Sequence, residues 1–278
     1  MVYYAVILFA EGWRMLIDFH THCFPDAIAQ RAIAKLSHAS GGLEPIYDGT
    51  LAGLKENMRR EGVDLSVVLI IATSAHQQSS VNRFAQAMNG DGIVAFGSVY
   101  PDAPDVLEEI DRIADMGLKG IKLHPEYQNF YVDDPKMEPI YRRISKHELI
   151  VSFHAGRDDG YMPPYHCTPQ RLSRALRWLD TPVVAAHWGG RCMEEDVLKY
   201  LCGTDVYFDT AFGYGCTVHQ MLLEMLARHG VEKFLFGTDA PWHTARCELR
   251  LIDSLELSSE EREKILFRNA QRLLGQKT

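Results

Sequence analysis

Short apolar runs alternate with amphipathic segments along almost the whole chain. Eight of these runs have the length and the β-branched or aromatic content of buried strands. They cover residues 16–19, 66–71, 93–99, 120–123, 149–153, 183–186, 206–208 and 234–236. From the second run onward the starts lie roughly 23 to 34 residues apart, which leaves room for one strand, one helix and two loops. The first interval is about twice as long, so it predicts an insertion around Gly41 with an extra helix.

The segments between the predicted strands have the periodicity of amphipathic helices. In residues 104–117, for example, Val106, Ile110 and Ile113 recur at helical spacing and share one face. Gly117 then provides a helix stop. Eight repeated strand–helix units predict an α/β fold, a parallel (β/α)8 TIM barrel, with a doubly wound open sheet as the alternative.

Composition fits one globular unit of this size. The 278 residues are 46% hydrophobic and 24% charged, and no linker or composition break divides them, so we expect one domain over residues 15–278. The net charge of −8 and the lack of a long basic run argue against nucleic acid or an anionic membrane as a partner. Six scattered cysteines without a CxxC pair predict reduced thiols and a cytoplasmic protein.

Residues 1–14 form a short N-terminal extension that needs its own interpretation. Its basic residue, Arg14, follows the apolar part, whereas a signal peptide has the opposite order. The apolar part is also too short for a membrane span. Two alternatives stay open: an added edge strand, or a misassigned start with Met15 as the natural first residue.

Polar side chains end several of the predicted strands. Asp18, His20 and His22 have the same parity on the first strand and should point to one side of it. If that side is the barrel interior, both imidazoles lie at the C-terminal mouth, where barrel enzymes place their active sites. Other strands carry Lys122, His124, His154, His187 and Asp239 at or near their ends.

These residue types together predict a divalent metal site. Histidine is the commonest metal ligand, and a carboxylate completes a site for zinc, iron, manganese or cobalt. Taken singly, each residue has a structural explanation, such as Asp239 capping a turn. The repetition of ligand types at four separate strand ends favours one shared site.

Six motifs carry a resemblance to a known family. They are MLIDFHTHCFP, GLKGIKLHPEY, HAG, AAHWGG, FGTDAPW and ILFRNAQRLLG, spread from Met15 to Gly275. Together they resemble the amidohydrolase superfamily, and more narrowly its amidohydrolase-related branch. That branch contains metal-dependent hydrolases and relatives of aminocarboxymuconate-semialdehyde decarboxylase. The resemblance implies a TIM barrel that binds a divalent metal, with zinc preferred over manganese, iron or cobalt.

The resemblance also implies roles for individual residues. His20 and His22 match the two metal ligands of the first strand. His154 matches the ligand of the fifth strand, and Asp239 matches the ligand of the eighth, which also accepts a proton from water. His187 matches the histidine of the sixth strand, which either binds a second metal or polarises a substrate oxygen.

Lys122 bears on the number of metal ions. Its KLHP context is similar to the KLYP run of dihydroorotases, in which the lysine is carboxylated and bridges two metals. The alternative is a buried ion pair inside the barrel, for example with Asp18, because a buried lysine needs a partner or a shifted pKa. We favour a single metal, as in the decarboxylase-like members. His124 replaces a glutamate of the deoxyribonuclease-like relatives, which counts against nuclease activity.

The implied ligand set supports two reactions on a small molecule. One is hydrolysis of an amide, lactone, ester or related bond by an activated water. The other is non-oxidative decarboxylation of an aromatic or unsaturated acid, for which Arg157 and Arg246 are candidate carboxylate-binding residues, with plain surface charge as their alternative. A non-catalytic ligand-binding barrel is disfavoured by the complete ligand set. The oligomeric state stays open, with a homodimer as one option.

A long loop after the fifth strand is expected to shape specificity. Residues 156–169 are rich in Pro, Tyr and Asp, and such loops cover the sites of barrel enzymes. Tyr161 and His166 are candidate substrate contacts, as is His124, with packing inside the loop as the alternative. Cys23 is expected to be a small buried hydrophobe rather than a pocket residue.

Overall fold

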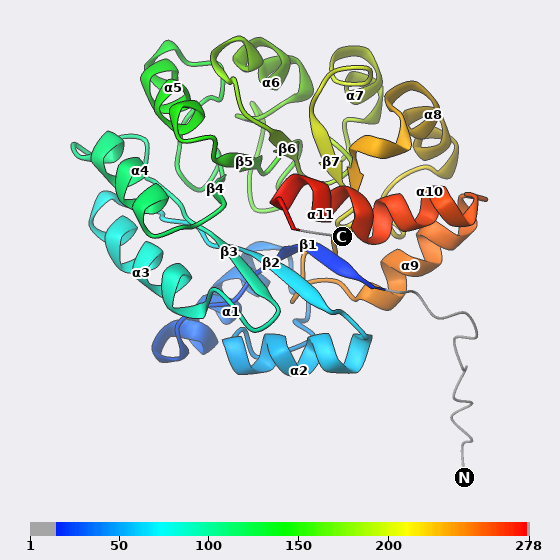
Figure 1. Cartoon of the computed structure of the whole chain (residues 1–278), viewed down its shortest axis with the longest axis horizontal. Helices are drawn as coiled ribbons and strands as arrows, with labels where there is room; N and C mark the ends of the chain where they lie inside the picture. The colour runs from blue at the N-terminus through cyan, green and yellow to red at the C-terminus, as the bar shows by residue number, and fades with distance from the viewer. Residues whose placement is uncertain (1–14, 277–278) are drawn as a thin grey trace.

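The computed structural model describes residues 15–276 as a ring of parallel strands surrounded by helices (Figure 1). The strands are β1 (Ile17–Thr21), β2 (Leu65–Leu69), β3 (Ile93–Phe96), β4 (Gly120–Leu123), β5 (Ile150–Phe153), β6 (Val183–Ala185), β7 (Tyr207–Asp209) and β8 (Phe234–Leu235). The α-helices are α1 (Asp26–Ala39), α2 (Leu51–Glu61), α3 (Gln78–Met88), α4 (Val106–Asp115), α5 (Glu138–Lys146), α6 (Pro169–Ala175), α7 (Glu194–Tyr200), α8 (His219–His229), α9 (Ala245–Ser254), α10 (Ser259–Glu263) and α11 (Asn269–Leu274). Short helical turns are η1 (Ala75–Gln77), η2 (Pro135–Met137), η3 (Leu176–Trp178), η4 (Val231–Lys233) and the π-helical η5 (Lys264–Arg268).

The strands close into a barrel. They form two hydrogen-bonded runs, β1-β2-β3 and β4-β5-β6-β7-β8. A bridge between Gly97 and Ile121 joins β3 to β4, and a bridge between Thr21 and Ala240 joins β1 to the end of β8. The Phe19 amide also donates to the Phe236 carbonyl over 2.7 Å, which seals the same seam. The (β/α)8 barrel is therefore confirmed, and the open sheet is excluded.

The predicted elements are present, with strand ends displaced by no more than three residues. Helix α4 buries Ile110 and Ile113 as its periodicity predicted, and Gly117 follows it with a φ of +74°. The expected insertion after β1 contains α1, a loop through Gly41, and α2. This insertion returns to the end of β1, where the Phe24 amide donates to the Gly49 carbonyl.

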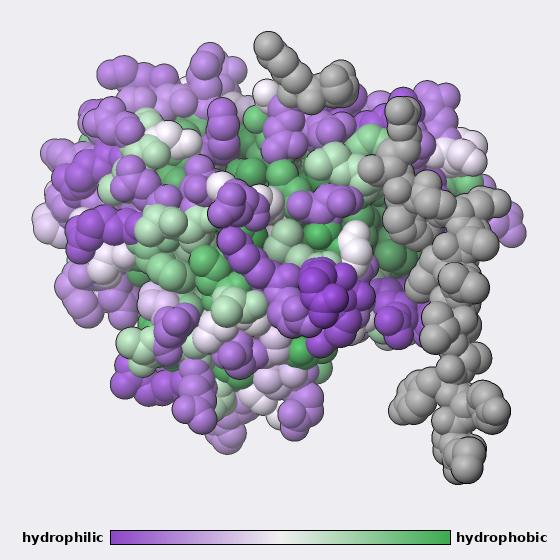
Figure 2. Space-filling view, turned by 60° about the horizontal axis from the view of Figure 1, so that its bottom comes forward, coloured by the Kyte–Doolittle hydropathy of each residue, from purple (hydrophilic) through white to green (hydrophobic). Residues whose placement is uncertain are grey.

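Helices cover the outside of the barrel, and the C-terminal segment completes it. The strands are almost entirely buried, as expected for a parallel sheet that packs against helices on its outer face. Asn269 in α11 is fully buried and donates to the carbonyls of Val231 and Phe234, which ties the last helix to β8. Figure 2 shows one face of the molecule, where hydrophilic side chains form most of the periphery and hydrophobic ones appear between them.

The two alternatives for residues 1–14 lie outside the described residues. Within residues 15–276, no helix combines the length and the apolarity that crossing a bilayer requires.

Candidate metal centre

The predicted ligands from β1 and β8 meet at the C-terminal end of the barrel. The Nε2 atoms of His20 and His22 lie 3.2 Å apart. Asp239 Oδ1 lies 2.9 Å from His22 Nε2 and 3.4 Å from His20 Nε2. The alternation of side chains along β1 brings both imidazoles to this point, as the sequence predicted.

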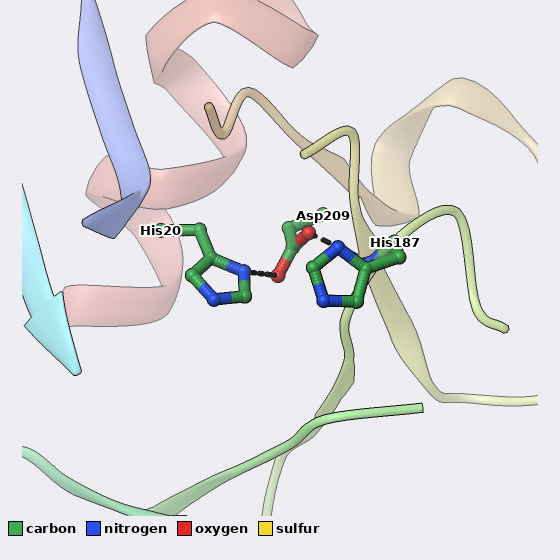
Figure 3. A group of neighbouring side chains, drawn as sticks. All are labelled: His20, His187 and Asp209. Carbon is green, nitrogen blue, oxygen red and sulfur yellow. Dashed lines mark hydrogen bonds and ion pairs between the residues drawn. The ribbon is translucent and has the colours of Figure 1, made fainter. Parts of the chain in front are cut away.

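The opposite nitrogen of each imidazole is held by an oxygen acceptor. His20 Nδ1 lies 2.9 Å from Asp209 Oδ2 (Figure 3), and His22 Nδ1 lies 2.7 Å from the Leu69 carbonyl oxygen. These acceptors assign the ring proton of each neutral imidazole to Nδ1, so each Nε2 presents a lone pair. Outer partners of this kind orient the histidine ligands of metal sites.

This arrangement fits a divalent metal ion. The Nε2 atoms of His20 and His22 and the carboxylate oxygen of Asp239 converge within 3.4 Å, and such a group could hold a cation between its members. A proton on one nitrogen satisfies a single pair of atoms, whereas a metal ion satisfies all three at once. Two histidines and one carboxylate are donors that zinc and its neighbours in the transition series accept.

His154 and His187 form a second pair beside this group. His187 Nε2 lies 3.1 Å from His154 Nδ1, and the ring centroids of His187 and His20 are 5.0 Å apart. His154 thus comes to the centre next to His187 and is not within the tightest group of His20, His22 and Asp239. His187 Nδ1 lies 3.2 Å from the Ala211 carbonyl, which leaves Nε2 of neutral His187 as an acceptor. That state suits metal ligation or proton uptake better than donation to a substrate oxygen.

Asp209 is a site residue that sequence reasoning missed. It ends β7, is fully buried, and links two of the predicted residues. Besides holding His20, its Oδ1 accepts the His187 backbone N–H over 2.9 Å (Figure 3). Burial raises the pKa of Asp209, and the positive charge nearby opposes that rise. The sequence does contain a signal for Asp209, because this residue directly follows a predicted strand, as His154 and His187 do.

Asp158 is the second missed residue, and it lies in the loop after β5. Its Oδ2 is 3.4 Å from His124 Nε2 and 3.9 Å from His154 Nε2, a buried nitrogen with no hydrogen-bond partner among residues 15–276. His124 stacks between Tyr127 and His154, with centroid distances of 3.7 and 4.2 Å. The His124 and His154 rings are within 11° of parallel, so their in-plane lone pairs do not meet on one ion. Asp158 therefore lies beside both rings, nearer to His124, and leaves His154 Nε2 without an acceptor.

Lys122 lies inside the barrel next to the metal ligands. It is fully buried, and its Nζ is 3.5 Å from His20 Nε2. Burial lowers its pKa to about 8, against the attraction of Asp209 and Asp239. Asp18, the partner considered from sequence, instead accepts hydrogen bonds from the Thr238 amide and hydroxyl over 3.0 and 2.6 Å. Asp18 therefore joins β1 to the segment that carries Asp239, and Lys122 faces the centre.

The protonation states of the centre suit ligation. Burial lowers the pKa of His20, His154 and His187, so these imidazoles are neutral at pH 7. Burial alone would raise the pKa of Asp239, but the nearby His20 and the hydrogen-bonding His22 outweigh it and hold the pKa well below its usual range. The centre thus offers neutral imidazoles and an ionised carboxylate, which are the forms that bind metals.

Backbone strain accompanies the site. His187, Phe212 and Asp239 are non-glycine residues with φ values of 59°, 63° and 67°, and they follow β6, β7 and β8. Left-handed conformations at such residues cost free energy and occur often at active sites. Here they turn the chain at the mouth of the barrel, where the candidate ligands lie.

The predicted arginines lie at the surface. Arg157 is exposed and pairs with Asp159 at 3.2 Å, while Arg246 is exposed in the first turn of α9. A better-placed arginine is Arg191, which sequence reasoning passed over. Its guanidinium binds Asp159 at 2.7 Å and lies 4.4 Å from the ring centroid of Phe212, whose ring neighbours that of His187.

The remaining predicted substrate contacts differ in their surroundings. His166 packs away from the ligands, with Nδ1 3.0 Å from the Pro125 carbonyl and its ring against Tyr131. Tyr161 is 41% exposed and lies near Tyr127. His124 is the one of this set that contacts a candidate ligand, His154. Cys23 is buried, with its thiol 3.7 Å from the Met88 sulfur, as expected for a small hydrophobe.

Comparison with solved structures supports the fold. An uncharacterized TIM-barrel protein from Bordetella bronchiseptica is 20% identical with a TM-score of 0.73, covering 94% of this chain and 98% of its own. 2,6-Dihydroxybenzoate decarboxylase from Rhizobium is 16% identical with a TM-score of 0.68, over 95% and 99% of the two chains. 5-Carboxyvanillate decarboxylase from Novosphingobium aromaticivorans, with bound manganese and a nitrobenzoic acid ligand, is 14% identical with a TM-score of 0.67, over 94% and 97%.

No curated protein matches the chain. The family model described as Amidohydrolase matches residues 17–276, nearly the whole length, and it spans all eight strands and every candidate ligand. The chain therefore belongs to this amidohydrolase family.

Proposed function

We propose that the chain is a metal-dependent hydrolase that acts on an amide, lactone, ester or related bond of a small molecule. The convergence of His20 Nε2, His22 Nε2 and Asp239 Oδ1 carries this proposal, because three acceptors at one point call for a cation. His154 is the proposed fourth ligand, reached through a small shift of the His154–His187 pair. Zinc is the proposed metal, and a divalent ion bound there would act as a Lewis acid and lower the pKa of water to about 7.

The residues around the centre supply the proton transfers. Asp239 has a side chain that is 14% exposed and lies beside both imidazoles, so it is the group proposed to accept a proton from the attacking water and return it to the leaving group. His187, with Nε2 as acceptor, is the proposed second proton acceptor or a ligand of a second metal. Lys122 stays a proposed structural residue in the single-metal form and becomes a bridging ligand if carboxylated.

A second candidate is non-oxidative decarboxylation of an aromatic acid. Two of the solved structures that share the fold are decarboxylases of such acids, and one of them holds manganese. In this reading the carboxylate-binding residue is Arg191 rather than Arg157 or Arg246, because Arg191 contacts the Phe212 ring beside His187. Hydrolysis remains the first proposal because the Asp239 carboxylate lies beside His20 and His22 and its side chain is 14% exposed to water.

The metal content of the purified chain tests the proposal. We expect about one zinc or manganese per chain in the wild type and none in His20→Ala. The matched control is His229→Ala, since His229 is also buried but stacks on Phe208 away from the centre. About two metals per chain would favour a carboxylated Lys122, and no metal after reconstitution would overturn the proposal.

Activity assays separate the two reactions. The metal-loaded enzyme is offered a panel of esters, lactones and amides, and in parallel a panel of hydroxybenzoic acids with carbon dioxide release as the readout. Turnover of the first panel, lost in Asp239→Asn, is the result expected for a hydrolase. Turnover confined to the second panel would replace it with decarboxylation.

A further inference from the structure

Metal ligand His22 is held by contacts from three separate parts of the chain. Its backbone N–H donates to the Ala240 carbonyl over 2.7 Å, and its Nδ1 lies 2.7 Å from the Leu69 carbonyl after β2. The third contact comes from Tyr47, whose hydroxyl donates to the His22 carbonyl over 2.5 Å. A carbonyl oxygen can only accept, so the hydrogen bond needs the tyrosine proton.

Tyr47 belongs to the insertion between β1 and β2, in the loop that joins α1 to α2. The same loop reaches the other ligand-bearing strand, because the Ile46 amide donates to the Pro241 carbonyl over 2.8 Å, two residues after Asp239. It also reaches back to β1, because the Phe24 amide donates to the Gly49 carbonyl over 2.8 Å. The loop thus joins the ends of β1 and β8, which together supply His20, His22 and Asp239.

The loop is anchored firmly enough to hold a ligand. Gly49 has a φ of +78°, and a Cβ there would lie 2.5 Å from Ile33 Cγ1, so the loop packs closely on α1. On its other side, Asp48 accepts from the Thr50 amide and hydroxyl over 3.0 and 2.7 Å. Thr50 in turn caps α2 by accepting the Gly53 amide. Both helices of the insertion therefore fix the position of Tyr47.

We propose that Tyr47 is a positioning residue of the metal centre, whose hydroxyl, held by the insertion, sets the place of His22 and so the affinity for the metal. This inference rests on the proposed metal-binding function. Partners one shell out from metal ligands typically contribute about 10- to 100-fold in metal affinity. Tyr47 contacts the backbone of a ligand rather than its ring, so we expect the lower end of that range.

Tyr47→Phe tests the inference because it keeps the ring and removes the hydroxyl. The matched control is Tyr141→Phe, which removes a hydroxyl that donates to the Val132 carbonyl over 3.0 Å and has no hydrogen bond to a candidate ligand. Each metal-free protein is titrated with Zn²⁺ in competition with a chromophoric chelator. We expect about 10-fold weaker binding for Tyr47→Phe and wild-type binding for Tyr141→Phe.

Cobalt spectra provide a second measurement that does not depend on the strength of binding. Each protein is loaded with Co²⁺, and we expect the visible absorption bands to change in Tyr47→Phe and to match the wild type in Tyr141→Phe. Equal zinc affinities together with identical cobalt spectra would overturn the inference. A wild type that binds neither metal would instead overturn the proposed function, so the two failures are distinguishable.

Discussion

At the scale of single residues, the candidate centre includes a carboxylate, Asp209, that holds two of its histidines in place. Asp209 holds the Nδ1 atom of His20 and the backbone of His187 at once, from a fully buried position at the end of β7. Such acceptors fix which nitrogen carries the proton and how the ring is turned, so they influence metal affinity without touching the metal.

Asp209→Asn is expected to weaken metal binding by about 10- to 100-fold, because an amide is a poorer acceptor for the His20 Nδ1 proton and loses the negative charge. The measurement is the same chelator competition with Zn²⁺. A suitable control is Asp111→Asn, which alters an Asp–His pair at the surface, where Asp111 Oδ1 is 2.6 Å from His147 Nε2. Unchanged affinity in Asp209→Asn would assign this residue to folding alone.

At the scale of elements, the site depends on turns that follow β5 and β6. The Arg191 amide donates to the Ala155 carbonyl over 3.0 Å, and the Arg157 amide donates back to the Arg191 carbonyl over 2.9 Å. This exchange extends the pairing of β5 and β6 past their ends, up to the segment that carries Asp158 and Asp159. It requires Gly156, which has a φ of +84° and no room for a side chain.

Gly156→Ala is expected to lower the free energy of unfolding by about 3 kcal/mol, because the new Cβ would lie 2.2 Å from the Arg191 backbone nitrogen in a left-handed conformation. Urea denaturation measures the change. Gly62→Ala is the control, since Gly62 has a similar φ of +73° but open space around it, and should cost about 1 kcal/mol. Equal losses in both variants would show that close packing at Gly156 is unimportant.

At the scale of the whole molecule, the proposed metal binding would be coupled to closure of the barrel. Three of the candidate ligands, His20, His22 and Asp239, come from β1 and the segment after β8, which meet at the seam of the barrel. A metal ion bound there joins the two ends of the fold, in addition to the Asp18–Thr238 hydrogen bonds and the packing of α11 on β8. A bound metal ion should therefore raise the free energy of unfolding of the barrel.

Zinc at about 100 times its dissociation constant is expected to stabilise the wild type by about 2.7 kcal/mol, which for a chain of this size raises the melting temperature by roughly 5 to 10 °C. Thermal unfolding with and without Zn²⁺ measures this shift. His229→Ala should keep the shift and His20→Ala should lose it. A shift of the same size in His20→Ala would place the stabilising ion elsewhere.

The architecture could be predicted from the sequence because each strand of a parallel barrel appears there as a separate short apolar run. It also predicted which side chains gather at the mouth, since His20, His22 and Asp239 follow directly from strand parity and strand ends. It failed where position depends on loops. Arg157 and Arg246 point to solvent, and Tyr47 reaches His22 across an insertion whose path no periodicity reveals. Asp209 could have been predicted, because it lies at the end of its strand, where the other candidate residues were sought.

The unequal exposure of the ligands has a kinetic consequence. The side chains of His22 and Asp239 are each 14% exposed, whereas those of His20 and Asp209 are 2% and 0% exposed, so water touches the candidate centre at His22 and Asp239. A metal ion and a substrate would then both approach the candidate centre past His22 and Asp239. A substrate bound there would block this approach. Metal exchange should therefore slow during turnover, even though no contact to the metal itself has changed.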